Sequence, residues 1–166
     1  NMVKPCTGLT PEEGAKIFYQ TALGGVDFIK DDELLGNPSY SHPADRVKAF
    51  RKAAKAAYEK SGNHVKYFVN VTSGTAEIMD NVKAVEDAGA DGIMINFAAV
   101  GYSVLKQVAE ETKLPILGHA AGSGMVYEGT LNGMSSPLAV GKLARLAGAD
   151  IVMVNTPYGG YPLSYQ

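Results

Sequence analysis

The chain of 166 residues lacks several features, and each absence narrows what the protein can be. A single cysteine, Cys6, excludes an internal disulfide and favours a reducing compartment, so we predict a cytoplasmic protein. The net charge of −2 provides no basic surface for nucleic acid or for an anionic membrane. No run of about 18 apolar residues is present, so no membrane-spanning helix is predicted. Residues 1–8 have no apolar core and are not expected to be a signal peptide.

The apolar residues that are present alternate between short runs and amphipathic segments, which is typical of repeated βα units and a mainly parallel sheet. Six strands are predicted, at residues 2–6, 26–30, 65–71, 92–97, 115–119 and 151–155. Helices are predicted between them, at residues 11–22, 44–61, 76–88, 103–112 and 137–147. About six βα units indicate part of a (β/α)8 TIM barrel, which needs roughly 200 to 250 residues; an open doubly wound sheet is the alternative.

The tetrapeptide Ala-Gly-Ala-Asp occurs twice, ending at Asp91 and at Asp150, and an apolar run follows each time. This pattern is typical of a helix end, a glycine C-cap and the entry into a buried strand. An α/β protein without an internal repeat can use the same turn, so both interpretations stay open.

Polar residues mark the ends of all the predicted strands, where parallel α/β proteins carry their functional groups. The six residues are Lys4, Lys30, Asn70, Asn96, His119 and Asn155. A strand-end asparagine can simply cap the following turn, and a histidine after an apolar run can be a hydrogen-bonded core residue. Each of the six is therefore a candidate with a structural alternative.

The segment at residues 24–33, GGVDFIKDDE, combines a lysine with acids at the end of a buried strand. Strand alternation places Lys30 and Asp32 on one face and Asp31 on the other. Asp32 and Glu33 offer the hard oxygen atoms that Mg²⁺ prefers. A cationic Lys30 would form a structural ion pair with them, whereas a Lys30 converted by CO₂ to a carbamate would supply a third anionic ligand. The residues alone leave both possibilities open.

This decapeptide resembles the activation motif of the ribulose-bisphosphate carboxylase large subunit and of its relatives, the RuBisCO-like proteins. Four further segments resemble other parts of this family in the same order: VKPCTGLTPEEGA, YFVNVTSGT, LPILGHAAGSG and KLARLAGADIVMVN. The family fold is a (β/α)8 barrel preceded by a smaller α/β domain. The resemblance therefore implies that residues 1–166 are a partial barrel domain, without the N-terminal domain and the last two βα units.

The resemblance also assigns expected roles to five residues. Lys30 matches the lysine that becomes carbamylated, and Asp32 and Glu33 match the two other protein ligands of Mg²⁺. Lys4 matches the first-strand lysine beside the reacting atoms of the substrate, and His119 the fifth-strand histidine that contacts the substrate. Lys4, Lys30 and His119 are thus the expected catalytic residues, and Mg²⁺ the expected cofactor. Family active sites form between two subunits, so a homodimer is expected.

Four departures from the carboxylase pattern remove cationic or polar groups. Cys6 replaces a second first-strand lysine, Ala120 replaces an arginine that helps to hold phosphate, and Met153 lies near the position of a sixth-strand histidine. Residues 156–162 contain no counterpart of the mobile-loop lysine that stabilises the CO₂ adduct. Without these cations the carboxylated intermediate loses stabilisation, so carboxylation is not expected.

The resemblance therefore implies an Mg²⁺-dependent enzyme that forms an enediolate on a phosphorylated keto-sugar-like substrate. Relatives use this step for an enolase reaction in methionine salvage, for isomerisation of a methylthio-ketose phosphate or for decarboxylation of a phosphorylated oxo-sugar acid. No residue of this chain selects among them. The alternatives are a genuine carboxylase, a catalytically silent barrel fragment, and an unrelated α/β small-molecule binder in which residues 30–33 form a surface ion cluster.

Overall fold

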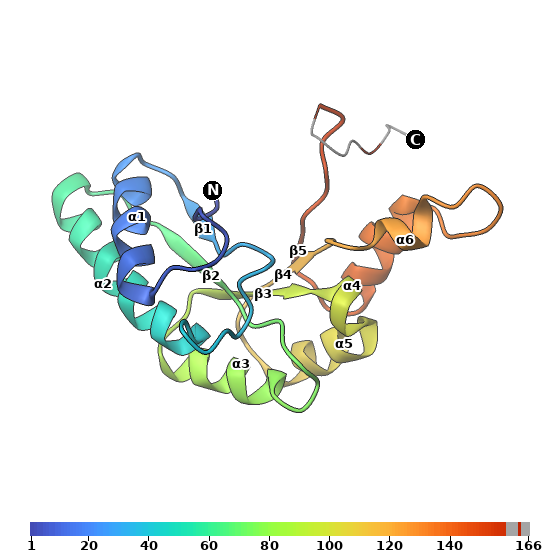
Figure 1. Cartoon of the computed structure of the whole chain (residues 1–166), viewed down its shortest axis with the longest axis horizontal. Helices are drawn as coiled ribbons and strands as arrows, with labels where there is room; N and C mark the ends of the chain where they lie inside the picture. The colour runs from blue at the N-terminus through green and yellow to red at the C-terminus, as the bar shows by residue number, and fades with distance from the viewer. Residues whose placement is uncertain (159–162, 164–166) are drawn as a thin grey trace.

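The computed structural model describes residues 1–158 and residue 163 (Figure 1). Within this part of the chain, five parallel strands form one sheet in the order β1-β2-β3-β4-β5. The strands are β1 (Phe28–Lys30), β2 (Lys66–Asn70), β3 (Gly92–Asn96), β4 (Ile116–His119) and β5 (Ile151–Val152). Each strand pairs with the next one along the chain. A doubly wound sheet would instead reverse its strand order, so the observed order is that of a barrel wall.

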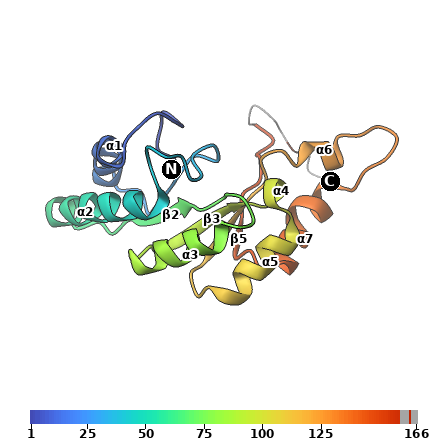
Figure 2. The ribbon, with the colours of Figure 1, turned by 60° about the horizontal axis from the view of Figure 1, so that its bottom comes forward.

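The helices follow the outer side of the curled sheet, as Figures 1 and 2 show. The longer ones are α1 (Pro11–Leu23), α2 (Pro43–Ser61), α3 (Ile78–Asp87) and α5 (Tyr102–Glu111). A π-helical turn, η1 (Pro137–Lys142), leads into α7 (Leu143–Leu146). All five predicted helical segments are thus confirmed to within a few residues. Two four-residue helices, α4 (Phe97–Val100) and α6 (Gly124–Tyr127), were not predicted, because so short a segment carries no helical periodicity. Within the described ranges no helix combines the length and the apolarity that a membrane crossing requires.

The prediction of a strand at residues 2–6 is wrong, and with it the count of six strands in this part of the chain. Only Met2 forms a bridge, parallel to Lys30 of β1. The Val3 N–H donates to the Lys30 carbonyl at 3.3 Å, and the Lys30 N–H donates to the Asn1 carbonyl at 3.0 Å. Pro5 has no N–H with which to continue the ladder. The segment therefore lies beside β1 without becoming a strand.

Apolar side chains from both layers fill the space between the sheet and the helices. The strands contribute alternate residues to this core, as a sheet with one helix-covered face requires. Its fully buried members include Ile29, Val69, Ile93 and Ile95 from the sheet, and Phe18, Val47, Val82 and Leu105 from the helices. A smaller cluster of Phe68, Met94 and Leu117 forms separately from this core. Gly92 admits the Phe68 ring, because a Cβ at Gly92 would lie 2.5 Å from it.

The two Ala-Gly-Ala-Asp segments take the structure that their sequence indicates. Gly89 and Gly148 end their helices with φ angles of +82° and +107°, a region that favours glycine. The Asp91 carboxylate then accepts the Tyr67 N–H of β2 at 3.2 Å, and the Asp150 carboxylate accepts the Ile116 N–H of β4 at 2.8 Å. Each acid ties the start of its own strand to the start of the preceding strand in the sheet.

Candidate active site

The predicted metal-binding segment lies at the carboxyl end of β1. Lys30 is the last residue of the strand and is only 7% exposed. Its Nζ donates to the Asp31 carbonyl at 3.0 Å and to the Met2 sulfur at 3.2 Å. Asp31 is fully buried and binds Arg46 of α2, on the helix side of the sheet. The predicted separation of Lys30 from Asp31 by strand alternation is therefore confirmed.

Lys4 and Asp32 form the shortest ion pair of this site, with 2.5 Å between Nζ and Oδ2. The other oxygen, Oδ1, accepts the Leu34 N–H at 2.9 Å. The hydrogen bond to Asp32 raises the pKa of Lys4. Burial opposes ionisation of Asp32, but the hydrogen bonds from Lys4 and from Leu34 outweigh it and lower the pKa of this carboxyl. Both groups are therefore charged at neutral pH.

Glu33 links two of the other predicted residues. Its Oε2 lies 3.8 Å from the Lys30 Nζ and 3.6 Å from the His119 Nε2. Burial lowers the pKa of Lys30 despite the nearby carboxylates, because desolvation disfavours the ammonium form. The unmodified Lys30 and Glu33 side chains therefore lie close enough for an ion pair. Because its pKa is lowered, Lys30 loses its proton more easily than an exposed lysine does.

The tautomer of His119 follows from its hydrogen bonds. The Ala121 N–H donates to Nδ1 at 3.1 Å, so Nδ1 is the acceptor and Nε2 carries the proton that faces Glu33. Burial, with the charge of Lys30, lowers the pKa of His119 and favours the neutral ring. With its amide nitrogen turned toward the end of β4, Asn96 donates to the carbonyls of Ala121 at 2.9 Å and His119 at 3.1 Å. Asn96 therefore supports the backbone that carries the histidine.

The donor set determines which metal arrangement this site can accept. Among residues 1–158 and 163, no three Asp, Glu, His or Cys side chains gather closely enough to hold a metal ion. Asp32 and Glu33 provide two carboxylates, and the ammonium form of the unmodified Lys30, 3.8 Å from Glu33, would repel a metal. These residues fit Mg²⁺ when Lys30 is carbamylated, because the site then has three anionic oxygen donors.

A buried polar network lies beneath the segment that carries Asp32 and Glu33. The Asp31 carboxylate accepts the Arg46 Nε–H at 3.0 Å, the Tyr67 hydroxyl at 2.6 Å and the Asn70 N–H at 2.9 Å. Burial raises the pKa of Asp31, while these three donors act in the opposite direction. The sequence did not predict the roles of Arg46 and Tyr67. Their only signal was the assignment of Asp31 to the helix-facing side of the strand, where a buried carboxylate needs partners.

A cavity of about 450 Å³ adjoins the His119 side of the site. Glu33 and His119 line it together with Ala120, Met153 and Asn155, the last being another of the predicted strand-end residues. Two of the departures from the carboxylase pattern, Ala120 and Met153, thus face the same space. Cys6 is half-buried. Of the predicted loop at 156–162, residues 159–162 lie outside the described residues.

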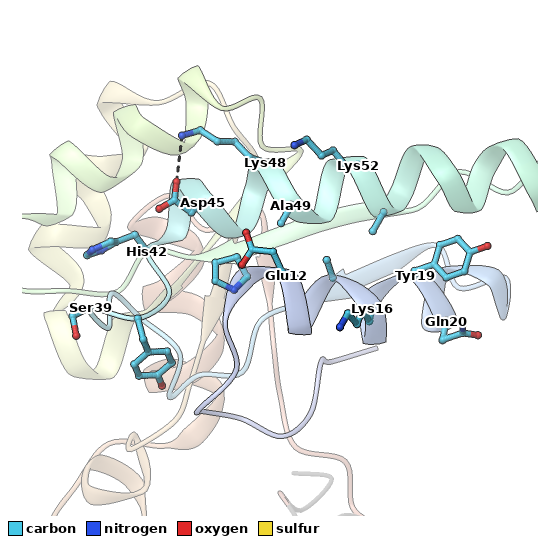
Figure 3. Close-up of a pocket in the computed structure, with 14 residues that line it drawn as sticks. Glu12, Lys16, Tyr19, Gln20, Ser39, His42, Asp45, Lys48, Ala49 and Lys52 are labelled. Atoms are coloured by element: carbon cyan, nitrogen blue, oxygen red, sulfur yellow. Dashed lines mark hydrogen bonds and ion pairs between the residues drawn. The ribbon is translucent and has the colours of Figure 1, made fainter.

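A larger cavity, of about 790 Å³, lies between α1 and α2 and is distinct from this site. Figure 3 shows residues that line it, among them Lys16 and Tyr19 of α1 and Lys48 and Lys52 of α2. None of the predicted strand-end residues lines this cavity. Size alone therefore does not identify the functional site, whereas the convergence of charged groups at the strand ends does.

A parallel α/β barrel wall with lysines, carboxylates and a neutral histidine at its carboxyl end is the architecture of the TIM-barrel class. Comparison with known proteins identifies the family. Residues 1–162 match the family model described as "Ribulose bisphosphate carboxylase large chain, catalytic domain", and the chain belongs to this family.

Curated relatives include both RuBisCO-like proteins and an enolase. The chain is 42% identical over 165 residues to a ribulose bisphosphate carboxylase-like protein of Archaeoglobus fulgidus, covering 98% of this chain and 38% of that protein. It is 40% identical over 144 residues to a 2,3-diketo-5-methylthiopentyl-1-phosphate enolase of Bacillus pumilus, covering 86% of this chain and 36% of that protein. The chain thus spans less than two fifths of the length of either relative.

Solved structures agree on the fold. A rubisco-like protein of Alicyclobacillus acidocaldarius superposes with a TM-score of 0.92 at 34% identity, covering 99% of this chain and 42% of that one. A dimeric archaeal Rubisco of Hyperthermus butylicus gives a TM-score of 0.81 at 36% identity, covering 90% and 36%. The resemblance predicted from the decapeptide is therefore confirmed. Like these neighbours, the chain has a curled parallel sheet of five strands with helices, an α/β half-barrel, and the predicted count of six βα units is not confirmed.

Proposed function

We propose that this chain carries the enolisation chemistry of a RuBisCO-like enzyme that does not fix CO₂. In this reaction a general base takes a proton from the carbon beside a carbonyl group of a phosphorylated keto substrate, which gives an enediolate. The observation that carries the proposal is the convergence of Lys4, Lys30, Asp32, Glu33 and His119 at the carboxyl ends of the strands. The similarity to an enolase that acts on 2,3-diketo-5-methylthiopentyl-1-phosphate supports the same reaction class here.

A carbamylated Lys30, Asp32 and Glu33 would hold Mg²⁺. When bound, Mg²⁺ supplies Lewis-acid polarisation of the substrate oxygens and so acidifies the neighbouring C–H. Carbamylation joins the Lys30 nitrogen to the carbon of CO₂ and releases one proton. The burial of Lys30 and the direction of its pKa shift support this step, because the neutral amine is the form that reacts.

Lys4 and His119 would contact the substrate from either side of the carboxylates. The Lys4 side chain is 55% exposed, so its ammonium can leave Asp32 and stabilise a developing enolate oxygen. His119 carries its proton on Nε2 and is neutral, so we propose that it donates a hydrogen bond to the substrate. Neither residue needs a change of charge to do this.

The absence of carboxylation is proposed from Ala120 and Met153. Both line the cavity next to His119, where the carboxylase pattern has an arginine and a histidine. The space therefore lacks cationic side chains at these two positions, which favours a substrate with a single phosphate and an uncharged end. As for assembly, the dimeric archaeal relative supports a homodimer.

Magnesium calorimetry on the full-length protein tests the metal site. We expect Mg²⁺ affinity to rise when bicarbonate is supplied, and Lys30→Met to abolish that rise. The matched control is Lys66→Met, because Lys66 forms an ion pair with Asp91 at the opposite end of the sheet. Binding that ignores both bicarbonate and Lys30 would contradict the carbamate and leave a structural ion pair.

Proton exchange in D₂O tests the chemistry. With 2,3-diketo-5-methylthiopentyl-1-phosphate as the substrate, the protein should catalyse exchange of the proton beside the carbonyl. Lys4→Ala should lower the exchange rate far more than the substrate affinity; equal losses would make Lys4 a binding residue only. The second candidate, a genuine carboxylase, is favoured by the 36% identity to the archaeal Rubisco. Fixation of labelled CO₂ into ribulose bisphosphate would establish it.

A further inference from the structure

The carboxamide of Asn70, at the end of β2, bridges the main chain of both proposed carboxylate ligands. Its Nδ2 donates to the Asp32 carbonyl and to the Glu33 carbonyl, each at 3.1 Å. Asn70 is uncharged and fully buried. We propose that Asn70 is a positioning residue that fixes the directions in which the Asp32 and Glu33 side chains project. This inference rests on the proposed function of these two residues.

The orientation of the Asn70 amide is set by a bond on its other side. The Thr72 N–H donates to Oδ1 at 3.0 Å, so the oxygen faces Thr72 and the nitrogen faces the acidic segment. Both amide protons then have an acceptor. A side chain of this type, with both donors and its acceptor engaged, has one well-defined position.

The main chain of Asn70 is held as firmly as its side chain. Its N–H donates to the Asp31 carboxylate at 2.9 Å, and its carbonyl accepts from the Arg46 guanidinium at 3.0 Å. The same Arg46 nitrogen also donates to the carbonyls of Leu35 at 3.0 Å and Gly36 at 2.9 Å. Asn70 and Arg46 together therefore hold residues 31–36 at both ends.

The acidic segment, residues 31–36, packs closely against the backbone that follows β2. A Cβ at Gly36 would lie 2.3 Å from the Thr72 carbonyl oxygen, so only glycine fits there.

Groups that orient metal ligands, as Asn70 does in this proposal, commonly change metal affinity by about 10- to 100-fold when they are removed. The carboxylates of Asp32 and Glu33 should therefore lose their common direction when the Asn70 amide is absent.

Hydrogen exchange on the metal-free, full-length protein tests the positioning directly. In Asn70→Ala, exchange of the Leu34 and Leu35 amides should rise about tenfold, because the bonds that restrain this turn are lost. Asn81→Ala is the matched control, since it removes the same carboxamide from α3, where the Asn81 carboxamide donates to the Ser73 hydroxyl at 2.9 Å. Exchange at Leu34 and Leu35 that equals the wild type, or that rises equally in Asn81→Ala, would overturn the proposal.

A second variant and a second measurement complete the test. Asn70→Ser keeps one hydroxyl donor, so its exchange should fall between wild type and Asn70→Ala; it decides the question if the alanine variant does not fold. Mg²⁺ affinity measured with bicarbonate should fall about 10- to 100-fold in Asn70→Ala and stay unchanged in Asn81→Ala. If the wild type binds no Mg²⁺, the proposed function fails, while the exchange data still support or overturn the role of Asn70.

Discussion

Acidic residues adjoin the strands at both ends of this sheet, but Asp32 and Glu33 are used differently from Asp91 and Asp150. At the amino-terminal end, Asp91 and Asp150 each accept a backbone N–H from the neighbouring strand. At the carboxyl end, the main-chain carbonyls of Asp32 and Glu33 are held by Asn70, while their carboxylates face lysines and a histidine. The first arrangement uses the carboxylate to fix the backbone, and the second uses the backbone to fix the carboxylate.

The two lysine–acid pairs show the same contrast. Lys66 is 59% exposed beside Asp91, so its ammonium stays hydrated and the pair contributes little to stability. Lys30 is buried beside Glu33, and its pKa is lowered by that burial. Burying this ion pair costs desolvation free energy, and its N–O distance of 3.8 Å is long. A functional role explains the pair better than a contribution to stability does.

The largest effects are expected when one acid is removed from each end of the sheet and the two variants are compared. Asp32→Ala should reduce Mg²⁺ affinity by more than the about 10- to 100-fold that loss of a supporting group costs, while the protein stays folded. Asp150→Ala should leave Mg²⁺ affinity unchanged and lower the free energy of unfolding by about 1–3 kcal/mol, because the Ile116 N–H loses its acceptor. Calorimetry and urea unfolding measure both. Equal losses of stability and metal affinity in the two variants would remove the distinction between the ends.

A smaller effect is expected when the cation that faces Asp32 is removed. The Lys4 ammonium contacts Asp32 Oδ2 and competes there with any bound cation, so Lys4→Met should raise Mg²⁺ affinity by about tenfold. Lys48→Met is the control, because Lys48 pairs with Asp45 on the exposed surface of α2. Unchanged or weaker Mg²⁺ binding in Lys4→Met, measured by titration with bicarbonate present, would show that Lys4 and the metal do not share Asp32.

The smallest expected effect concerns the buried network under the acidic segment. Burial raises the pKa of Tyr67 well above its ordinary value of 10.0. The unfolded chain therefore loses this proton at lower pH than the folded chain does, and stability falls as pH rises above about 10. Tyr67→Phe should flatten that fall in urea unfolding measured across this range. Tyr102→Phe, which removes a less buried hydroxyl whose pKa is raised less strongly, should change it less. If stability fell with pH as steeply in Tyr67→Phe as in the wild type, the raised pKa of Tyr67 would not be its cause.

Local patterns in the sequence were sufficient for much of the fold and for naming residues that lie close together in the structure. The helix predicted at residues 11–22 is α1, and the structure adds a capping box at its start, with the Thr10 and Glu13 side chains each bonded to the other's backbone. Alternation along residues 26–32 correctly separated Lys30 from Asp31. The prediction of a strand at residues 2–6 was wrong because it relied on apolar content. Pro5 lacks the N–H that would continue the ladder, and the segment lies at the edge of β1.

The sequence by itself determined the order of the βα units, the family and the five residues gathered at the strand ends, because these depend on local periodicity and on a specific decapeptide. Tertiary structure alone decided which cation meets which acid: Asp32 pairs with Lys4, 28 residues away, and Glu33 lies between Lys30 and His119. It also decided the support, since Arg46 and Asn70 reach the acidic segment from a helix and a neighbouring strand. Such contacts depend on how the helices pack against the sheet, and the spacing of residues along the sequence does not specify that packing.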